Sequence, residues 1–395
     1  MATLPPNFTV LQVVPELDTG GVEQTAIDVT RAVVAAGGRS LVASSGGRLE
    51  PVLKGAGGEL VRLPVHSKNP LTIASNTGAL IDTVRREGVG LIHVRSRAPA
   101  FSALGAARAT KVPLIATYAG VYNAKSGLKR WYNAVMTRGD LVIANSEFTR
   151  AHVIAEHRVD PAKVVAIPRG VDLNRFDPER VSPERVERVL QAWGVAPDDG
   201  RVRILLAGRL TRWKGQLLLV DAAERLRVKG RDDFLIVLAG DDQGRDAYRA
   251  EILRAVRDAG LTDHVRLAGH CEDMPAAYLA ADLAVAPSLD PEAFGRTAVE
   301  PQAMGRPVLA ADHGAPRETV IAGETGWLVA PGDADAWARA LETAITAGPE
   351  GRAAMGAAGR ARARALYSVE AMGAATLDVY ARVLAARSVA PRTTD

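Results

Sequence analysis

Two glutamates, Glu292 and Glu300, are separated by seven residues in a segment that follows the apolar run 283–286. The run predicts a buried strand, and residues 295–303 predict a helix behind it. Backbone N–H groups at the start of such a helix favour an anion. One carboxylate could then bind hydroxyl groups beside that anion while the other reaches a second group. Two glutamates at this spacing are also common by chance, so the prediction depends on the flanking strand and on the PS and FG dipeptides.

Two cations, Arg209 and Lys214, lie in a loop over residues 207–215, directly after the apolar run 203–207. Arg presents a forked set of donors, whereas Lys presents a point charge. Together at the carboxyl end of a strand, these two groups suit a diphosphate. A solvated basic loop is the alternative interpretation.

Paired glycines, Gly20 and Gly21, stand between the apolar run 8–14 and a helical pattern over 22–36. Glycine permits a positive φ and lets backbone N–H groups approach an anion at the start of a helix. The segment is not Gly-x-Gly-x-x-Gly, so it lacks the dinucleotide-binding fingerprint. A tight strand–helix turn without a ligand is the alternative.

Short apolar runs alternate with helix-compatible stretches along the chain, which is typical of parallel sheets covered on both faces. The predicted strands are 8–14, 40–43, 91–94, 113–117, 141–144, 163–167, 203–207, 234–239, 265–268, 283–286 and 307–310. The Pro-, Gly- and Asp-rich segment 168–178 predicts a linker, so we expect two doubly wound α/β domains and a tail helix over 369–386. Ligands bind beyond the carboxyl ends of the strands in such sheets, and two facing domains would form a cleft there.

The composition agrees with two globular domains. The chain has 395 residues, of which 47% are hydrophobic and 24% charged, and this excludes wholesale disorder. Its one cysteine, Cys271, excludes an intrachain disulfide framework and a cysteine-cluster metal site. Neither a secretory signal nor an apolar run of ~18 residues is found, which predicts a cytoplasmic protein. The net charge of +4 decides little, and without a recognised binding motif we expect no nucleic-acid partner.

Taken together, these segments resemble the family 4 glycosyltransferases, retaining enzymes of the GT-B fold, over nearly the whole chain. The most specific part is Glu292–Glu300 followed by AMGRPV at 303–308. Further support comes from AGRLTRWKG at 207–215, the paired glycines, IPRGVD at 167–172 and LAGH at 267–270. The resemblance implies two Rossmann-like domains facing across a cleft. Their expected bounds are 1–170 for acceptor binding and 171–366 for the nucleotide-sugar, with a helix over 367–395 that crosses back to the first domain.

The resemblance also implies roles for individual residues. Arg209 and Lys214 would bind the donor diphosphate, and Glu292 would contact hydroxyls of the donor sugar, so these three form the predicted catalytic group. Glu300 would reach the nucleotide ribose. The residues implied in donor binding are Gly20, Gly21, Gly269, His270, Cys271, Phe294, Gly295, Arg296, Thr297 and Glu300. Family members need no metal, so the expected ligand is a GDP- or UDP-sugar donor, as substrate, and no metal ion.

One position departs from the family pattern. The family often has a histidine in a Thr-x-His-Gly segment, and here Ala119 takes its place in Thr117-Tyr118-Ala119-Gly120. Three explanations stay open: a subfamily without the histidine, an engineered substitution, or a weakened enzyme. His93, which follows Leu91-Ile92, could replace the missing imidazole or could be purely structural.

The segment 118–138 mixes basic and aromatic residues, and a helix is predicted over 131–138. The predicted acceptor residues are Tyr118, Ala119, Tyr122, Asn123, Lys125, Lys129 and Arg130. A cationic helix with aromatic residues suits an anionic glycan or a lipid-linked acceptor at a membrane surface, although an ordinary amphipathic helix has the same pattern. We therefore expect peripheral contact with the inner face of the cytoplasmic membrane.

The predicted function is transfer of a hexose from GDP-mannose or a UDP-hexose to a glycan or lipid-linked acceptor, in lipopolysaccharide or envelope polysaccharide synthesis. Two alternatives remain. One is a nucleotide-sugar epimerase of the same fold, which would need acid and base groups around the sugar. The other is a nucleotide-sugar-binding protein with weakened or no catalysis, which Ala119 makes conceivable.

Overall fold

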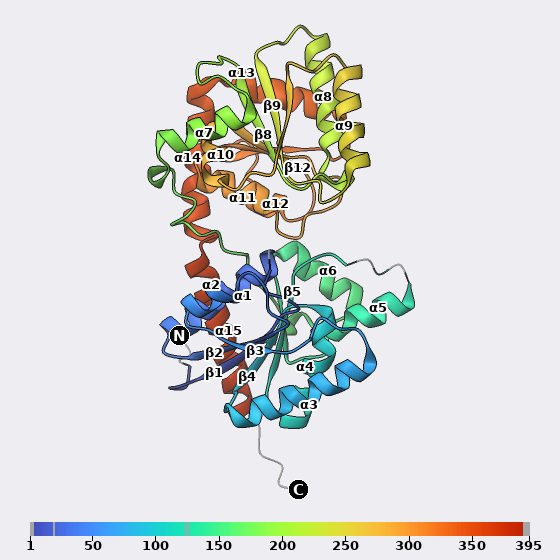
Figure 1. Cartoon of the computed structure of the whole chain (residues 1–395), viewed down its shortest axis with the longest axis vertical. Helices are drawn as coiled ribbons and strands as arrows, with labels where there is room; N and C mark the ends of the chain where they lie inside the picture. The colour runs from blue at the N-terminus through green and yellow to red at the C-terminus, as the bar shows by residue number, and fades with distance from the viewer. Residues whose placement is uncertain (1–3, 19, 123, 125, 390–395) are drawn as a thin grey trace. The chain divides into compact units, whose positions relative to one another are not determined.

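The computed structural model describes residues 4–18, 20–122, 124 and 126–389 (Figure 1). The chain divides into two compact units. Unit 1 comprises residues 1–170 together with 369–395, and unit 2 comprises residues 171–368. No helix in the described part of the chain is long and apolar enough to cross a membrane.

Unit 1 contains a seven-stranded sheet in which all neighbouring strands are parallel, in the order β3-β2-β1-β4-β5-β6-β7. The strands are β1 (Thr9–Val13), β2 (Arg39–Ser44), β3 (Glu59–Arg62), β4 (Leu91–Val94), β5 (Leu114–Tyr118), β6 (Leu141–Ala144) and β7 (Val164–Ala166). The strand order reverses between β1 and β4, which is the point where a doubly wound sheet opens a crevice for a ligand.

Helices cover both faces of this sheet. They are α1 (Gly21–Ala35), α2 (Glu50–Gly55), α3 (Pro70–Arg86), α4 (Arg97–Thr110), α5 (Gly127–Asn133), α6 (Glu147–His157) and α15 (Val369–Val389). Leu11 and Val13 of β1 belong to one buried cluster, whereas Val10 belongs to another that includes Met372 and Tyr380 of α15. Because strand side chains alternate between the two faces, α15 covers a face that would otherwise expose apolar residues.

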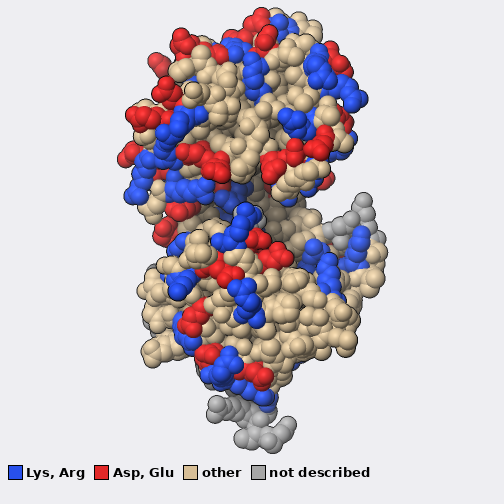
Figure 2. All heavy atoms as spheres, viewed as in Figure 1, with Lys and Arg blue, Asp and Glu red and all other residues tan. Residues whose placement is uncertain are grey.

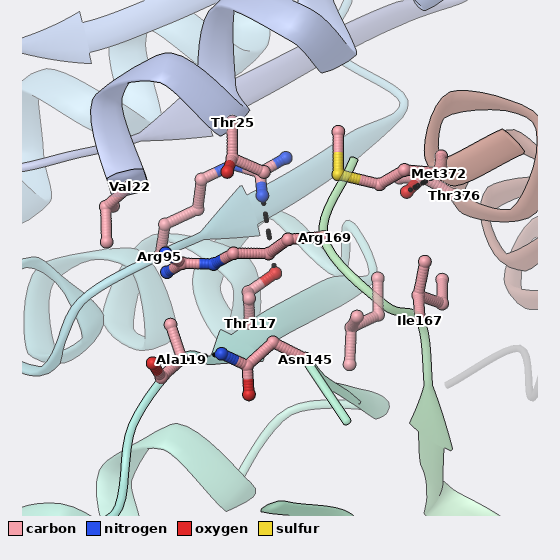
Figure 3. A pocket seen from close by; sticks show the side chains of 11 residues that line it. Val22, Thr25, Arg95, Thr117, Ala119, Asn145, Ile167, Arg169, Met372 and Thr376 are labelled. Carbon is pink, nitrogen blue, oxygen red and sulfur yellow. Dashed lines mark hydrogen bonds between the residues drawn. The ribbon is translucent and has the colours of Figure 1, made fainter. Parts of the chain in front are cut away.

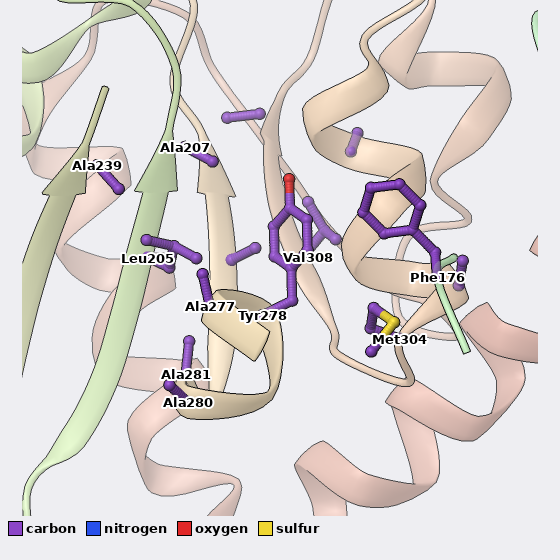
Figure 4. Packing of buried hydrophobic residues seen from close by; sticks show 14 of the residues in the cluster. Phe176, Leu205, Ala207, Ala239, Ala277, Tyr278, Ala280, Ala281, Met304 and Val308 are labelled. Atoms are coloured by element: carbon purple, nitrogen blue, oxygen red, sulfur yellow. The ribbon is translucent and has the colours of Figure 1, made fainter. Parts of the chain in front are cut away.

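Unit 2 contains a six-stranded parallel sheet in the order β10-β9-β8-β11-β12-β13. Its strands are β8 (Val202–Ala207), β9 (Phe234–Ala239), β10 (Val265–Gly269), β11 (Leu283–Ala286), β12 (Val308–Ala311) and β13 (Gly326–Val329). Its helices are α7 (Pro183–Trp193), α8 (Gln216–Val228), α9 (Asp246–Asp258), α10 (Met274–Ala280), α11 (Arg296–Ala303), α12 (Pro316–Thr319), α13 (Ala334–Thr346) and α14 (Gly348–Leu366). Figure 4 shows one face of its core, where Leu205, Tyr278 and Met304 pack with Phe176.

The predicted fold class, two doubly wound parallel α/β sheets, is confirmed. The predicted strands 91–94, 141–144, 234–239 and 283–286 have the observed bounds. Strands β3 and β13 were not predicted. Both lie at an edge of their sheet. β3 is half exposed with Glu59 and Arg62 at its ends, so it does not form the continuous apolar run of a central strand. β13 is apolar but has only four residues, of which Trp327 and Leu328 are partly exposed.

The helix predicted over 131–138 begins earlier and changes type. It consists of α5 (Gly127–Asn133) and a 3₁₀ turn over Ala134–Thr137. Ser126 starts α5, since its side chain accepts a hydrogen bond from the N–H of Lys129. The prediction missed this start because the serine precedes the basic and aromatic residues on which it was based.

Candidate active site

In unit 2, two predicted residues come together at the carboxyl ends of neighbouring strands. Lys214 lies in a 3₁₀ turn (Arg212–Lys214) after β8, and Glu292 lies in the loop after β11. Nζ of Lys214 donates to Oε1 of Glu292 over 2.5 Å, and each side chain is 12% exposed. Ser288 donates its hydroxyl to the same Oε1 over 2.7 Å. Oε2 of Glu292 has no hydrogen-bond partner among the described residues, so it can accept a bond from a ligand.

Backbone contacts hold the two loops beside each other. Gly215 has φ +77°, and a Cβ there would overlap the carbonyl oxygen of Pro287. The N–H of Leu289 donates to the carbonyl of Trp213 over 2.6 Å. Glycine at 215 thus permits both the left-handed backbone and the close approach of the loop that carries Glu292.

The main chain of Glu292 is fixed from its other side. Its carbonyl accepts a bond from the N–H of Ala315 over 2.9 Å. Gly314 has φ +66°, and a Cβ there would lie 2.7 Å from the same carbonyl oxygen. The carboxylate is therefore preorganised by backbone geometry as well as by its partners.

The third predicted catalytic residue, Arg209, lies on the same loop as Lys214 and is exposed. Its carbonyl accepts a bond from the side chain of Gln216 over 2.9 Å. Within the described ranges, its guanidinium has no hydrogen-bond or ion-pair partner. A planar cation with unused donors beside a lysine can bind an anion with two phosphate groups.

The predicted helix after the first glutamate is confirmed as α11, and Gly295 precedes it in the left-handed region with φ +77°. Glu300 is 6% exposed. Its Oε1 accepts from Nε of Arg296 over 2.8 Å and its Oε2 from the hydroxyl of Tyr278 over 3.2 Å. Burial, and after it the charge of Glu300, raises the pKa of Tyr278 well above its usual value, so this hydroxyl remains a donor.

Ser288 and Tyr278 were missed by sequence reasoning. Ser288 stands in the segment that drew attention to Glu292, but a serine there carries no signal of its own. Tyr278 lies on α10, 22 residues before Glu300, and only the packing of that helix brings its hydroxyl to the carboxylate. No spacing rule could have paired them.

The other predicted donor-binding residues differ in what they expose. Phe294 is 3% exposed and packs against the ring of Tyr367, so its side chain is not open to a ligand. Gly269 ends β10 with φ +69°, and His270 after it is exposed. Burial raises the pKa of Cys271, which keeps its thiol protonated and argues against a nucleophile. The donor contacts of all these residues, and of Thr297, stay predictions.

In unit 1, the paired glycines do not use the positive φ that glycine permits. Gly20 is extended, with φ 172°, and Gly21 is the first residue of α1 without a positive φ. The glycines matter instead for space. A Cβ at Gly20 would overlap the carboxylate of Glu23, and one at Gly21 would overlap the guanidinium of Arg169. Their contact with a donor stays a prediction.

The predicted acceptor residues do not share one environment. Tyr118 is fully buried, and its hydroxyl lies 3.1 Å from Nε2 of His157. Ala119 lines a cavity, whereas Arg130 on α5 is exposed and pairs with Glu156 over 2.7 Å. The ring of Tyr122 lies under the guanidinium of Arg97, 3.9 Å from its centroid, and Lys129 is exposed. Asn123 and Lys125 lie outside the described residues.

His93 has a structural role. It is fully buried, with Nδ1 2.6 Å from the hydroxyl of Tyr380 and Nε2 2.7 Å from the hydroxyl of Thr117. Of the two interpretations open for this residue, the structural one is confirmed.

Comparison with known proteins identifies the family. The family model glycosyltransferase family 4 matches residues 19–175, and glycosyl transferases group 1 matches residues 191–362. A glycosyltransferase of Rickettsia africae ESF-5 with a solved crystal structure is 31% identical, with a TM-score of 0.88 and coverage of 96% of this chain and 99% of that one. The chain belongs to these glycosyltransferases.

Two further relatives agree. Alr3699/HepE of Anabaena, solved with UDP and glucose, has the same fold at 23% identity, with a TM-score of 0.81 and coverage of 95% of this chain and 100% of that one. Among curated proteins, D-inositol 3-phosphate glycosyltransferase of Salinispora tropica is 33% identical over 257 residues, which are 64% of this chain. The match spans about half of that relative, 52% of its length.

Proposed function

We propose that the protein transfers a hexose from a nucleotide-sugar to a hydroxyl group of an acceptor, with retention of anomeric configuration. The observation that carries this proposal is the Lys214–Glu292 pair, 12% exposed on each side, at the carboxyl ends of β8 and β11. Arg209 lies on the same loop as Lys214, and its guanidinium has no partner among the residues that the structure describes. Cations for a diphosphate and a carboxylate for sugar hydroxyls meet there, as the resemblance implies.

The reaction needs this charge pattern. The acceptor oxygen forms the new bond to the anomeric carbon, the bond from that carbon to the diphosphate breaks, and the hydroxyl proton leaves with the diphosphate. Negative charge grows on the departing group, so fixed cations at Arg209 and Lys214 stabilise the transition state. Oε2 of Glu292 accepts a hydrogen bond from a sugar hydroxyl and orients the sugar.

We also propose that these cations act without a metal ion. In the described part of the chain, no three His, Cys, Asp or Glu side chains are grouped so that they could hold one. The proposal itself rests on the position of Arg209 and Lys214, and transfer measured in excess EDTA tests it. The donor is proposed to be GDP-mannose or a UDP-hexose, with Gly269 and Cys271 beside the base.

Two classes of acceptor are proposed. The resemblance points to a glycan or lipid-linked acceptor of lipopolysaccharide or envelope polysaccharide synthesis. The curated relatives are named for D-inositol 3-phosphate, which supports a small phosphorylated cyclitol instead. An acceptor panel that contains both classes distinguishes them by which product forms.

The test measures nucleoside diphosphate release and product formation in EDTA for the wild type and for Lys214→Ala and Glu292→Ala. Each substitution should lower the transfer rate by about 10²–10³-fold, the usual effect of removing one preorganised polar group. Lys229→Ala is the matched control, since Lys229 also pairs with a glutamate, Glu342 at 2.9 Å, but at the surface. Unchanged turnover in both site variants would refute the assignment.

Product analysis without an acceptor separates the alternatives. An epimerase would release an altered nucleotide-sugar or sugar when only the donor is present. A binding protein would retain nucleoside diphosphate, measurable by calorimetry or as a thermal shift, without turning over any acceptor. A nucleoside diphosphate at a hundred times its Kd would stabilise the fold by about 2.7 kcal/mol. When UDP, GDP and ADP are compared at one concentration, the nucleotide with the lowest Kd gives the largest stabilisation.

A further inference from the structure

Unit 1 contains a cavity at the carboxyl ends of β4 to β7, beside the point where the strand order reverses. Figure 3 shows the side chains that line it, which include Arg95, Thr117, Ala119, Asn145 and Arg169. Its volume is about 20 Å³, so it admits a terminal chemical group rather than a whole sugar ring. None of the residues predicted to bind the donor lines it.

Arg95 brings a buried positive charge to this cavity. It is 3% exposed, and its Nε donates to the side-chain oxygen of Gln12 over 3.0 Å. Throughout the described residues, no carboxylate lies within ion-pair distance of it. Burial lowers the pKa of Arg95, and Tyr380 and then the charge of Asp28 act against this; Asp28 is already paired with Arg31 over 2.8 Å. A buried cation without an acid partner is unfavourable, and an anionic ligand would relieve this.

Arg169 adds a second guanidinium from the chain that follows β7. Its guanidinium lies against Gly21 at the start of α1, where a Cβ would overlap Nη1. The first turn of α1 contributes Val22 to the wall, and Thr25 follows it one turn later. The amino-terminal end of a helix carries partial positive charge, so α1 adds to the field of the two arginines.

Asn145 supplies a hydrogen-bond acceptor beside the two arginines. It is 3% exposed, and its Nδ2 donates to the carbonyl of Ala119 over 3.2 Å. Its Oδ1 is buried without a hydrogen-bond partner among the described residues. Buried amide oxygens are rarely left unpaired, so this atom calls for a hydroxyl or amine from a ligand.

The side chain at position 119 determines how much space the cavity offers a ligand. It lines the cavity at the position where the resembled family often has histidine. An imidazole there would fill space that the methyl group leaves open. The chain therefore combines a smaller side chain at this wall with two guanidinium groups around the space.

From these contacts, we propose that the cavity binds a terminal oxyanion of the acceptor, a carboxylate or a phosphate, between Arg95 and Arg169. A hydroxyl next to that oxyanion donates to Oδ1 of Asn145. The assignment rests on the proposed function, since it concerns the molecule that receives the sugar. It goes further by naming a charged group that the acceptor must carry and the residues that select it.

Calorimetry with the full chain tests this assignment, with glucuronate, glucose 6-phosphate and glucose as probes. The two anions should bind at least tenfold more tightly than glucose, and the stronger of them identifies carboxylate or phosphate. Equal binding of all three probes would overturn the proposal.

Two substitutions locate the site without removing a buried arginine. Asn145→Asp keeps the shape and adds a negative charge, and Ala119→His fills the space. Each should weaken anion binding at least tenfold, whereas Arg108→Ala, on the exposed side of α4, should not. Unchanged anion binding in both cavity variants would overturn the assignment. A retained unfolding transition of unit 1, measured by calorimetry, shows that weaker binding does not come from loss of the fold.

The result can be separated from that of the proposed function. Anion binding that the cavity variants weaken, together with a lack of glycosyl transfer, would refute the function and leave the anion site standing. Transfer to an acceptor without a charged group, at the rate of its anionic counterpart, would refute the anion site and leave the function standing.

Discussion

Lys214 and Glu292 neutralise each other in the free protein, and this is how two charged side chains can be 88% covered at the end of a sheet. Breaking a pair of this kind leaves one buried charge without a partner. A donor that binds there must therefore replace what each group loses, with a phosphate for the lysine and a hydroxyl for the glutamate.

His93 makes the stability of unit 1 depend on pH. Burial, and after it the charge of Arg95, lowers the pKa of this imidazole well below its usual value. In the unfolded chain a histidine takes up a proton near pH 6.5, so below that pH the unfolded state binds more protons than the folded state. The free energy of unfolding should then fall as the pH decreases, by at most about 1.4 kcal/mol per pH unit for this one group.

Denaturant unfolding at pH 7 and pH 5.5 measures this dependence. His93→Gln should show a smaller loss of stability between the two pH values than the wild type. His66→Gln, at an exposed position, is the control and should behave as the wild type does. An identical pH dependence in the wild type and the His93 variant would show that this histidine is not responsible.

At the residue scale, spacing and residue type were enough to single out Lys214 and Glu292. The reason is that both lie in loops directly after apolar runs, and parallel strands bring such loops to the same edge. The contact between Tyr278 and Glu300 could not be predicted, because it depends on how α10 packs beside α11. The sequence could not show whether Gly20 and Gly21 serve a positive φ or a close approach, because both favour glycine; Gly20 is extended with φ 172°.

At the scale of elements, α5 leaves two large apolar side chains exposed close together in the sequence. Leu128 is 76% exposed and Trp131 is 52% exposed, and Lys129 and Arg130 lie between them. Basic residues around exposed apolar ones are typical of helices that bind at the interface of an anionic membrane. The peripheral membrane contact expected from the sequence would use this element.

The corresponding prediction concerns cosedimentation with vesicles that contain anionic lipid. Replacing both Leu128 and Trp131 by serine should lower the affinity for these vesicles about tenfold, because at least one large apolar side chain no longer enters the interface. The bound fraction falls accordingly. Val228→Ser at the end of α8 removes an equally exposed apolar side chain, 84% exposed, and should change nothing. Equal binding of the double variant and the wild type would exclude α5 as the contact.

The total charge of +4 does not show how the charged side chains are distributed over the molecule. Figure 2 shows Lys and Arg interspersed with Asp and Glu over the visible face of unit 2. Charged side chains of this unit form ion pairs, such as Arg185 with Asp273 at 2.7 Å. The informative charges are the few that lack such a partner or exchange it on binding. This explains why composition alone could not indicate a substrate.

The division into units gives a prediction for the whole chain. Removing residues 369–395 takes away α15, including Tyr380, which is fully buried and bonded to His93. Unit 1 should then lose its cooperative unfolding transition, because one face of its sheet is uncovered. Residues 171–368 should still bind nucleoside diphosphate. Calorimetric unfolding and nucleotide titration of the shortened chain check both, and an unchanged transition of unit 1 would contradict the role given to α15.

The path of the chain also sets the order in which the protein can be completed during its synthesis. A ribosome delivers the first 170 residues early, but unit 1 lacks α15 until the last segment has emerged. Unit 2 is continuous in the sequence and can finish first, although it is made later. The growing protein therefore carries an apolar sheet face that waits for about two hundred residues to be added, and this is the stage at which a chaperone would have something to protect.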